Sequence, residues 1–329
     1  MFNKILNDFK EVDLDEMRFE GFLEKRANEI KKCVENVKNG SGWYDIKTCP
    51  ICNSEKREIF LNRFDINIMK CKGCGLGYVE KFPNDTNDVY SAEEYLPMAK
   101  SDYLDHVKYR LKRFGRERLD LILSYVDLAP NDINLLDVGC GTGWFLDYSK
   151  SLGLNVSGQE LGKELAKFTS SKLGIKVWNQ PLSKIPKEKR FDVITLFDVI
   201  EHVPNPIEVI NGISDHLEPG GISILFTPNF DSLAFKILGN RNSLIMPVEH
   251  LYYFTKESLG IAIDKSNLEI LHFETKGMDI PDIYSYYKDD KKDKGASGFL
   301  RENRNELQSI IDASGCANHM RFILRKPMN

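Results

Sequence analysis

The sequence lacks several features that would place the protein in a membrane, a secretory pathway or a nucleic-acid complex. No stretch approaches about 18 uninterrupted apolar residues, so a membrane helix is not expected. Charged residues interrupt Met1–Asp8, which argues against a secretory signal. The 45 Lys and Arg against 49 Asp and Glu give a net charge of −4, without a dense basic stripe for electrostatic binding of nucleic acid. These absences predict a cytoplasmic protein with no nucleic-acid partner.

A disulfide framework is also missing. The seven cysteines are an odd number, and four of them form two C-x-x-C pairs, which suits metal binding in a reducing compartment better than disulfides. Eighteen residues separate the pair Cys49 and Cys52 from the pair Cys71 and Cys74, as in four-thiolate zinc sites. Four thiolates complete a tetrahedron, so the site would be structural. Residues 46–82 are therefore predicted to form a zinc ribbon, whose folding free energy the Zn²⁺ would supply.

The composition is otherwise that of a globular protein: 329 residues with 42% hydrophobic content can form a large α/β domain and a smaller unit. The most informative stretch begins at Ile133–Val138, a short apolar run typical of a strand buried on both faces. Three glycines follow: Gly139, Gly141 and Gly143. Glycines let a chain turn sharply from strand to helix and let a ligand approach the backbone. The dinucleotide fingerprint is not met, because Trp144 occupies the third spaced position.

Further strands continue this pattern. They are predicted at 154–158, 175–178, 191–197, 222–226, 268–273 and 320–324, with a helix at 206–217 and another at 299–311. Glu160 follows the second strand, twenty-three residues past Asp137. An acidic side chain about 20 residues beyond a glycine loop is where doubly wound nucleotide-binding sheets hold a ribose diol.

The chain resembles the class I S-adenosylmethionine-dependent methyltransferases in five ordered stretches: LLDVGCGTG, GQE, FDVITLFDVIEHVPNP, HLEPGGISILFTPN and VEHLYYFT. The resemblance covers roughly 130–275, with a final strand near 319–325. It implies an α/β fold with a Rossmann-like sheet of seven strands, the last antiparallel and at the edge. The predicted organisation is an N-terminal helical segment at 1–45, the zinc ribbon at 46–82, a helical lid at 83–130 and the methyltransferase domain at 131–329. Tyr90, Tyr95 and Tyr103 would face the acceptor from the lid.

The same resemblance implies S-adenosylmethionine as the cofactor. Backbone N–H groups of the loop could meet its methionine carboxylate as they would a phosphate, with Asp137 bracing that end. Glu160 would accept two hydrogen bonds from the ribose hydroxyls. The other residues expected at the cofactor are Cys140 in the loop, Gln180 after the third strand and Asp198 at the end of the fourth.

Two histidines are candidates for the base that a hydroxyl acceptor needs. Such a base typically adds about 10²–10⁴ in rate. We favour His250, oriented or supplemented by Glu249, because residues 230–250 are predicted as a loop or short helix that folds over the acceptor site. His202 is the other candidate, and it is equally consistent with a structural histidine beside Pro204.

The acceptor is predicted to be a sugar or glycoconjugate hydroxyl, as in polysaccharide biosynthesis. The EH-x-x-Y pattern at 249–253 and the four cysteines are similar to deoxysugar C-methyltransferases, which have a large further domain that this chain is too short to hold. C-methylation of a ketosugar is thus one alternative. The IEH and EHLYYFT segments are similar to ubiquinone-pathway O-methyltransferases.

Two other readings stay open. Asp198, Glu201, His202 and His250 could copy the divalent-ion ligands of small-RNA 2′-O-methyltransferases, with donors suited to Mg²⁺ or Mn²⁺. A non-catalytic, methyltransferase-like binding module is the opposing class.

Outside the site, residues 1–40 are predicted as a helix that packs on its own chain or forms a homodimer contact. Residues 278–298 are predicted to be exposed, and Cys140 and Cys316 to be small buried residues.

Overall fold

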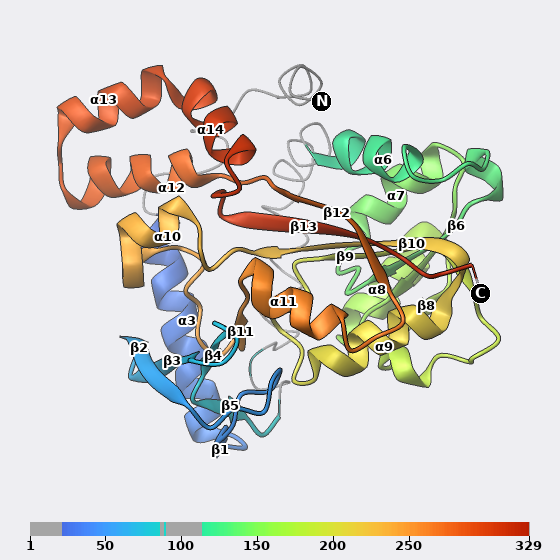
Figure 1. The fold of residues 1–329 in the computed structure, drawn as a ribbon, viewed down its shortest axis with the longest axis horizontal. Coiled ribbons are helices and arrows are strands. Elements are labelled where there is room, and N and C mark those ends of the chain that lie inside the picture. Colours follow the sequence, from blue (N-terminus) through green and yellow to red (C-terminus); the bar gives the residue numbers. More distant parts are fainter. Residues whose placement is uncertain (1–21, 86–88, 90–113, 329) are drawn as a thin grey trace. The chain divides into compact units, whose positions relative to one another are not determined.

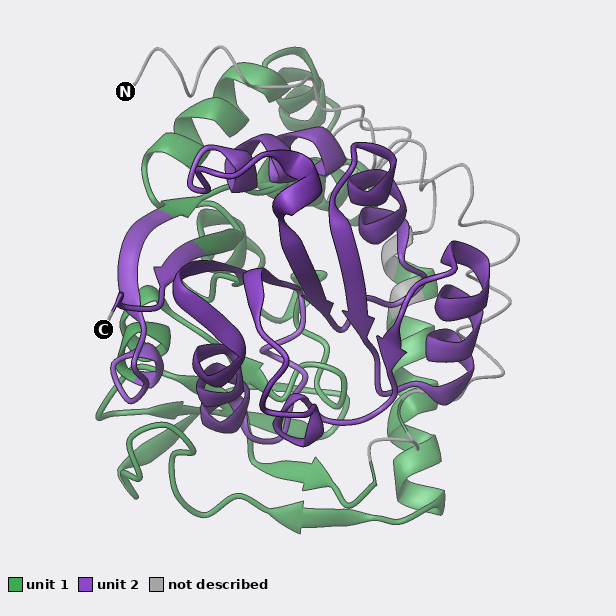
Figure 2. Ribbon diagram, turned by 90° about the vertical axis from the view of Figure 1, so that its right-hand side faces the viewer, with its two compact units in different colours: residues 1–89, 227–261, 274–321 green, residues 90–226, 262–273, 322–329 purple. Residues whose placement is uncertain are grey.

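The computed structural model describes residues 22–85, 89 and 114–328 (Figure 1). It divides into two compact units, coloured separately in Figure 2. Unit 1 comprises residues 1–89, 227–261 and 274–321, and unit 2 comprises 90–226, 262–273 and 322–329. The domains predicted from the sequence are continuous segments of the chain, whereas these two units each combine several segments. The division into units does not test the predicted domain boundaries, which stay predictions.

A seven-stranded sheet runs in the order β12-β13-β10-β9-β6-β7-β8. Its parallel part consists of β6 (Asn134–Val138), β7 (Asn155–Gln159), β8 (Val177–Trp178), β9 (Phe191–Phe197) and β10 (Leu217–Pro228). The central strands are almost wholly buried, as their continuous apolar sequences predict. The strands expected at 133–138, 154–158, 175–178 and 191–197 are confirmed within two residues. β10 begins five residues earlier than expected, because an irregular stretch precedes Ile222.

The last two strands are β12 (Glu269–Thr275) and β13 (His319–Arg325). The N–H of Gly220 donates to Lys326 O, and the N–H of Asn229 donates to Asn318 O, both at 2.9 Å. Residue numbers therefore fall along β13 as they rise along β10, which confirms an antiparallel final strand. The expectation that it lies at the edge is wrong, because β12 occupies the edge. Burial explains the order: six of the seven residues of β13 are buried, whereas β12 is largely half-exposed.

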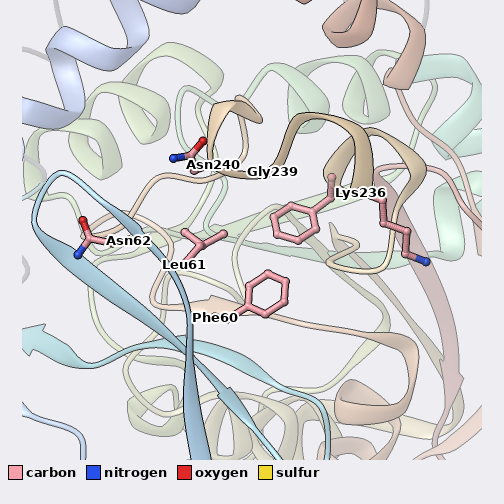
Figure 3. Close-up of a pocket in the computed structure, with 7 residues that line it drawn as sticks. Phe60, Leu61, Asn62, Lys236, Gly239 and Asn240 are labelled. Atoms are coloured by element: carbon pink, nitrogen blue, oxygen red, sulfur yellow. The ribbon is translucent and has the colours of Figure 1, made fainter.

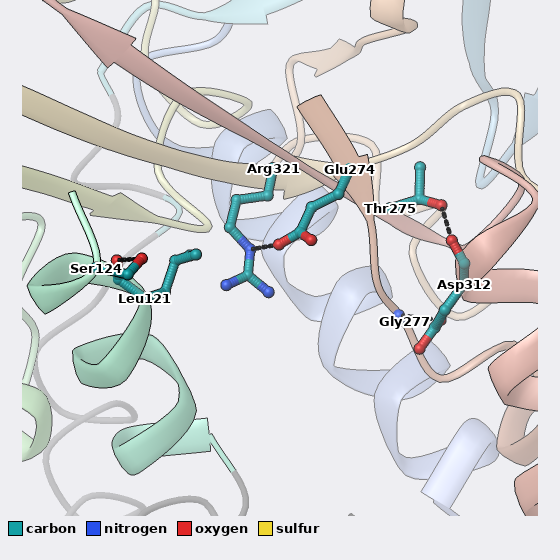
Figure 4. A network of polar contacts seen from close by, with 7 residues as sticks. All are labelled: Leu121, Ser124, Glu274, Thr275, Gly277, Asp312 and Arg321. Carbon is teal, nitrogen blue, oxygen red and sulfur yellow. Dashed lines mark hydrogen bonds and ion pairs between the residues drawn. The ribbon is translucent and has the colours of Figure 1, made fainter. Parts of the chain in front are cut away.

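Side-chain contacts reinforce this end of the chain (Figure 4). Arg321 of β13 forms an ion pair with Glu274 of β12, with Nε and Oε1 3.1 Å apart. The hydroxyl of Thr275 donates to Asp312 O at 2.9 Å. The two strands are therefore joined by side chains as well as by backbone, as is typical of neighbours in an antiparallel ladder.

Helices of unit 2 pack with the parallel strands around one apolar core. They are α6 (Arg116–Leu123), α7 (Trp144–Ser151), α8 (Lys163–Leu173) and α9 (Pro206–His216), with 3₁₀ turns η3 (Pro130–Asp132) and η4 (Leu182–Lys184). The core includes Leu119 and Ile122 of α6, Phe145 of α7 and Leu135 of β6. The predicted helix at 206–217 is confirmed as α9. It starts at a proline after Asn205, whose side chain accepts a hydrogen bond from the N–H of Glu208.

Unit 1 contains two small sheets. The first is four-stranded, in the order β11-β4-β3-β2, and its strands are β2 (Arg57–Arg63), β3 (Ile66–Cys71), β4 (Gly77–Val79) and β11 (Tyr252–Tyr253). The second pairs β1 (Trp43–Asp45) with β5 (Lys81–Pro83). The short strands expected between the cysteine pairs are confirmed by β2 and β3. Unforeseen is β11, which reaches the first sheet from about 170 residues further along the chain.

The remaining helices contradict two predictions made from the sequence, one about residues 299–311 and one about residues 278–298. They are α3 (Phe22–Asn39), α10 (Leu233–Leu238), α11 (Lys256–Ile263), α12 (Asp279–Ser285), α13 (Lys294–Glu302) and α14 (Arg304–Ala313), with η5 (Gly239–Arg241) and the π-helical η6 (Tyr286–Asp290). The single helix expected at 299–311 is wrong, because the chain leaves helical geometry at Asn303 between α13 and α14. The exposed segment expected at 278–298 is wrong in its first part, since every residue of α12 is buried.

Some expectations concern parts of the chain that the structure leaves undescribed. Tyr90, Tyr95 and Tyr103 of the predicted lid lie outside the described residues, as do the first 21 positions of the chain. Among the residues that are described, α3 buries Ile30 and Val34, as the helical pattern predicts. No helix in this described part combines the length and apolar character needed to cross a membrane.

Candidate functional site

The glycine loop between β6 and α7 has a backbone that other residues would adopt only under strain. Gly139, Gly141 and Gly143 have φ angles of 66°, 53° and 74°. A Cβ atom at Gly139 would lie 2.6 Å from a methyl carbon of Val199, and one at Gly143 would lie 2.5 Å from a methyl carbon of Thr169. At Gly141, by contrast, nothing lies within 4 Å of such an atom. The loop is thus packed at its two ends and open at its centre, where a ligand could reach the backbone.

The carboxylate of Glu160 lies against this loop, as its sequence position predicts. Its Oε2 accepts a hydrogen bond from the N–H of Gly141 at 3.0 Å, and its Oε1 accepts one from the N–H of Gly162 at 2.7 Å. Burial raises the pKa of Glu160, while these backbone donors lower it. The glycine loop and the acid of the neighbouring strand therefore form one polar site at the carboxyl ends of β6 and β7.

Asp137 lies beneath the loop and is 5% exposed. Its Oδ1 accepts a hydrogen bond from the hydroxyl of Thr195 at 2.7 Å. Burial raises the pKa of Asp137 to about 7, against the lowering effects of the Thr195 hydrogen bond and the positive charge of Arg118. Asp137 can therefore change its charge near neutral pH.

The raised pKa makes Asp137 a source of pH-dependent stability. Between about pH 4 and pH 7 the Asp137 carboxyl group is protonated in the folded chain and ionised in the unfolded chain. The free energy of unfolding therefore falls as the pH rises, by up to about 1.4 kcal/mol per pH unit. Above pH 7 the cost is constant. We expect Asp137→Asn to be less stable than, or equal to, the native chain at pH 4 and more stable at pH 8. Urea unfolding followed by circular dichroism across this range measures the difference.

A matched control for this measurement is Asp147→Asn, since Asp147 lies on the exposed face of α7. It should leave the pH dependence of the unfolding free energy as it is in the native chain. If Asp137→Asn retained the same loss of stability between pH 4 and pH 7, the assignment of this titration to Asp137 would be wrong.

Arg118 is a site residue that the sequence analysis missed. Its guanidinium lies 3.9 Å from the ring centroid of Phe197 and 5.4 Å from that of Trp144. It is 9% exposed, in a cation–π arrangement at the carboxyl end of β9. No motif marks it, because it comes from α6, in the segment interpreted as a lid.

The other predicted cofactor residues have different surroundings. Cys140 is buried within the core of unit 2, as expected, so only its backbone is in the loop. The side-chain amide of Gln180 donates to Lys184 O at 2.7 Å, while the backbone carbonyl of Gln180 accepts from the side-chain amide of Gln159 at 3.0 Å. Asp198 ends β9 in the left-handed region, at a φ of 58°, an uncommon conformation that is enriched in functional sites. Cys316, expected to be buried, is partly exposed, because it lies in the turn after α14.

The two candidate bases belong to different units. In unit 2, Nε2 of His202 lies 3.8 Å from Oε1 of the buried Glu201, too far for a hydrogen bond. In unit 1, His250 is 3% exposed and its Nδ1 lies 2.9 Å from Leu244 O. Because Asp198, Glu201 and His202 are in one unit and His250 is in the other, the predicted four-residue cation site stays a prediction.

The contact of His250 fixes the position of its proton. A carbonyl oxygen can only accept a hydrogen bond, so Nδ1 of the neutral ring must carry the hydrogen. The lone pair of the neutral ring is therefore on Nε2, the nitrogen that would accept a proton if His250 acts as a general base. Glu249 precedes it, with its backbone N–H bonded to Met246 O at 3.1 Å.

The four predicted metal ligands lie together in unit 1. The sulfur atoms of Cys49 and Cys74 are 3.6 Å apart, those of Cys52 and Cys71 are 3.5 Å apart, and all four lie within 4.8 Å of one another. A tetrahedral zinc ion with Zn–S bonds of about 2.3 Å requires sulfurs about 3.8 Å apart. The hydrogen bond between Cys49 and Cys74 lowers the pKa of Cys49 to about 5 and raises the pKa of Cys74, so this pair favours one thiolate and one thiol in the absence of a metal ion. The cluster could therefore hold a structural metal ion.

A pocket of about 590 Å³ lies elsewhere in unit 1 (Figure 3). It is lined by Phe60, Leu61 and Asn62 of β2 and by Phe235, Lys236, Gly239 and Asn240 of α10 and η5. The rings of Phe60 and Phe235 are nearly parallel, with centroids 5.9 Å apart, and they bound an apolar space with amide groups at its margin. None of these residues was singled out from the sequence, although those from α10 and η5 lie in the stretch 230–250 that was predicted to fold over the acceptor site.

A family model described as "Methyltransferase domain" matches residues 103–273, a little over half of the chain. The chain is 29% identical over 187 residues to the ubiquinone biosynthesis O-methyltransferase of Shewanella pealeana, covering 51% of this chain and 78% of that protein. It is 32% identical over 133 residues to the protein of the same name from Rickettsia typhi, covering 38% of this chain and 54% of the relative.

Among solved structures, the chain is similar to one in a complex between the Haloferax volcanii Trm112 methyltransferase activator and a methyltransferase. The TM-score is 0.51 with 12% sequence identity, over 71% of this chain and 98% of that one. At this identity the similarity concerns the fold alone.

Proposed function

Because the chain belongs to the family of S-adenosylmethionine-dependent methyltransferases, we propose that it methylates a hydroxyl oxygen of a sugar or glycoconjugate, with His250 as general base. The observation that carries this proposal is the contact of His250 Nδ1 with Leu244 O, which makes Nε2 the nitrogen that would accept a proton if the ring acts as a base. The reaction class agrees with the O-methyltransferase names of the relatives.

The glycine loop has the features that the cofactor requires. S-adenosylmethionine supplies an electrophilic methyl group on a positively charged sulfur that is already a good leaving group. Backbone N–H groups at the open Gly141 and at the start of α7 suit the methionine carboxylate. Glu160 has a carboxylate that can exchange its bond with Gly141 for the ribose hydroxyls. Asp137 would meet the amino group, and in its ionised form it would balance that positive charge.

The residues around the acceptor would supply alignment and proton removal. Alignment of the reacting groups can contribute on the order of 7–11 kcal/mol. His250 would take the hydroxyl proton on Nε2, and the Leu244 carbonyl would stabilise the imidazolium that forms by holding its Nδ1–H. Glu249 would orient the acceptor or add to the negative potential near the imidazolium.

The pocket of unit 1 supports a carbohydrate acceptor. Phe60, which is 42% exposed, offers apolar surface for the face of a sugar ring, with the buried ring of Phe235 beside it, and the amides of Asn62 and Asn240 can both donate to and accept from hydroxyls. An aromatic series within the same unit connects this pocket with the base: Phe235 contacts Phe230, Phe230 contacts Tyr253, and Tyr253 contacts His250.

A phenolic hydroxyl is the second candidate acceptor, favoured by the ubiquinone biosynthesis names of the relatives. Radiolabelled methyl transfer from S-adenosylmethionine to UDP-linked hexoses and to 3,4-dihydroxybenzoate separates the two. We expect label in the hexose. Label only in the phenol would overturn the sugar assignment, and cofactor binding without transfer to any hydroxyl compound would favour the non-catalytic module.

The four cysteines are part of the same proposal, as a structural zinc site. We expect one zinc ion per chain by atomic emission, because the sulfur spacing fits a tetrahedral site. Stripping the metal with a chelator should accelerate amide hydrogen exchange in residues 46–82 and leave the protection of β6 and β9 unchanged, because zinc binding contributes to local folding. Cys49→Ser should lose the metal, whereas Cys316→Ser should retain it. A zinc-free chain with the same exchange pattern would contradict the assignment.

A further inference from the structure

We infer that Arg63 is a positioning residue for His250: through the carbonyls of Asn242 and Ile245 it holds the segment whose Leu244 oxygen fixes the imidazole tautomer. Arg63 belongs to the four-stranded sheet β11-β4-β3-β2, called the cysteine sheet below because the two cysteine turns flank its strands. The inference rests on the proposed function, in which His250 is the base. It gives the cysteine sheet a role in the reaction that neither the sequence motifs nor the relatives indicate.

The first observation is the anchoring of Arg63. It is the last residue of β2, and one nitrogen of its guanidinium donates to Asn242 O at 2.7 Å and to Ile245 O at 2.6 Å. Hydrogen bonds from a charged donor are shorter and stronger than neutral ones. A residue of the cysteine sheet thus holds two carbonyls about 180 positions away in the sequence.

These two carbonyls flank the contact of His250. Leu244 lies between them, and its backbone N–H is itself held by the side-chain oxygen of Asn242 at 2.8 Å. The N–H of Ile245 also donates to Asn242 O, at 3.1 Å. The segment 242–245 is therefore a compact turn closed by the Arg63 guanidinium. Loss of that cation would release the turn that presents Leu244 O to the imidazole.

The second observation is a strained turn directly before His250. The N–H of Glu249 donates to Met246 O, which closes a four-residue turn with Pro247 and Val248 at its centre. Val248 has a φ of 91°, as the third residue of a type II turn requires, and glycine is the usual residue there. A β-branched residue in this conformation persists only where the surrounding structure imposes it. Val248 is 2% exposed, so packing holds it in place.

The strained turn is tethered to the cysteine sheet on both sides. Arg63 holds the chain before it. After it, the N–H of Val79 donates to Leu251 O at 3.1 Å, and β11 pairs with β4 through Tyr252 opposite Tyr78 and Tyr253 opposite Gly77. His250 lies between these two tethers. The cysteine sheet is therefore the frame on which the Glu249–His250 segment is built.

Nitrogen NMR of the full-length, zinc-loaded chain labelled with ¹⁵N-histidine tests the inference directly, with His250→Gln used to assign the resonance. The native chain should show His250 as the Nδ1–H tautomer. Arg63→Ala should shift it toward a mixture of tautomers, and Arg63→Lys should restore the native signal, because a single nitrogen of Arg63 makes both bonds. The matched control is Arg57→Ala, which removes a guanidinium from the same strand that donates to Ile46 O within the cysteine unit.

The result that overturns the inference is a native tautomer in Arg63→Ala, or the same change in Arg57→Ala, which would indicate general loosening of the sheet. A second arm measures kinetics with UDP-linked hexose and with 3,4-dihydroxybenzoate. Arg63→Ala should lower kcat about tenfold or more with an unchanged Kd for S-adenosylmethionine. If neither probe is methylated, or if His250→Gln has native kcat, the proposed function fails, while the tautomer measurement still decides whether Arg63 positions the imidazole.

Discussion

Replacement of His250 by glutamine should lower kcat for methyl transfer by about 10²–10⁴-fold, the range that a positioned general base contributes. Glutamine fills a similar volume and can donate a hydrogen bond to Leu244 O, so the loop should keep its structure. What is lost is the Nε2 lone pair that would accept the hydroxyl proton. The Kd for S-adenosylmethionine should be unchanged, because the glycine loop and Glu160 are not altered.

Steady-state kinetics and calorimetric titration with the cofactor measure these two quantities in parallel. His272→Gln is the matched control, a partly exposed histidine of β12 that the site does not include. His202→Gln tests the competing candidate, whose Nε2 lies 3.8 Å from the Glu201 carboxylate. A native kcat in His250→Gln together with a large loss in His202→Gln would move the base to His202.

Replacement of Glu160 by alanine should weaken cofactor binding by about 10²–10⁴-fold. The carboxylate would accept two charge-assisted hydrogen bonds from the ribose diol, each worth roughly 1.5–3 kcal/mol. It also organises the loop through its bonds with the N–H groups of Gly141 and Gly162, and alanine removes both. Isothermal titration with S-adenosylmethionine measures the change in Kd.

Glu164→Ala is the control for this titration, because Glu164 is an exposed acid in the first turn of α8, four residues away. It removes the same charge from the same region and should leave Kd within about twofold. An unchanged Kd in Glu160→Ala would refute the assignment of the ribose grip. If both variants lost affinity for S-adenosylmethionine equally, the effect would be due to long-range electrostatics. Added salt would then weaken it by screening.

Much of unit 2 could be predicted from short sequence patterns. The run before Asp137 is apolar at every position that its strand buries, and glycines follow at the points where the chain needs positive φ angles. Glu160 was found by its distance in sequence from the loop, because parallel neighbouring strands bring their carboxyl ends to one edge of the sheet. Each of these inferences uses residues that are near one another in the sequence or that occupy equivalent positions in successive strand–helix units.

Other site features left no local signal. Arg118 comes from a helix without a motif, yet its guanidinium lies over Phe197 at the end of β9. Nothing in the sequence around Arg63 indicates its role, because its partners Asn242 and Ile245 come beside it only in the folded chain. The sequence of one chain does not indicate which of these distant residues come into contact. The segments between them do not reveal the path by which the chain folds back or the position at which it does so.

By itself the sequence determined the family, the positions of the parallel strands along the chain, the glycine loop with its acid, and the four-cysteine pattern, because periodicity and turn chemistry act over a few residues. Tertiary structure alone decided that β13 lies inside the sheet, that β11 joins the cysteine sheet, and that a valine occupies a left-handed turn before His250. These outcomes depend on which buried surfaces find each other over long stretches of chain. Packing of that kind overrides local preference, as the φ angle of Val248 demonstrates.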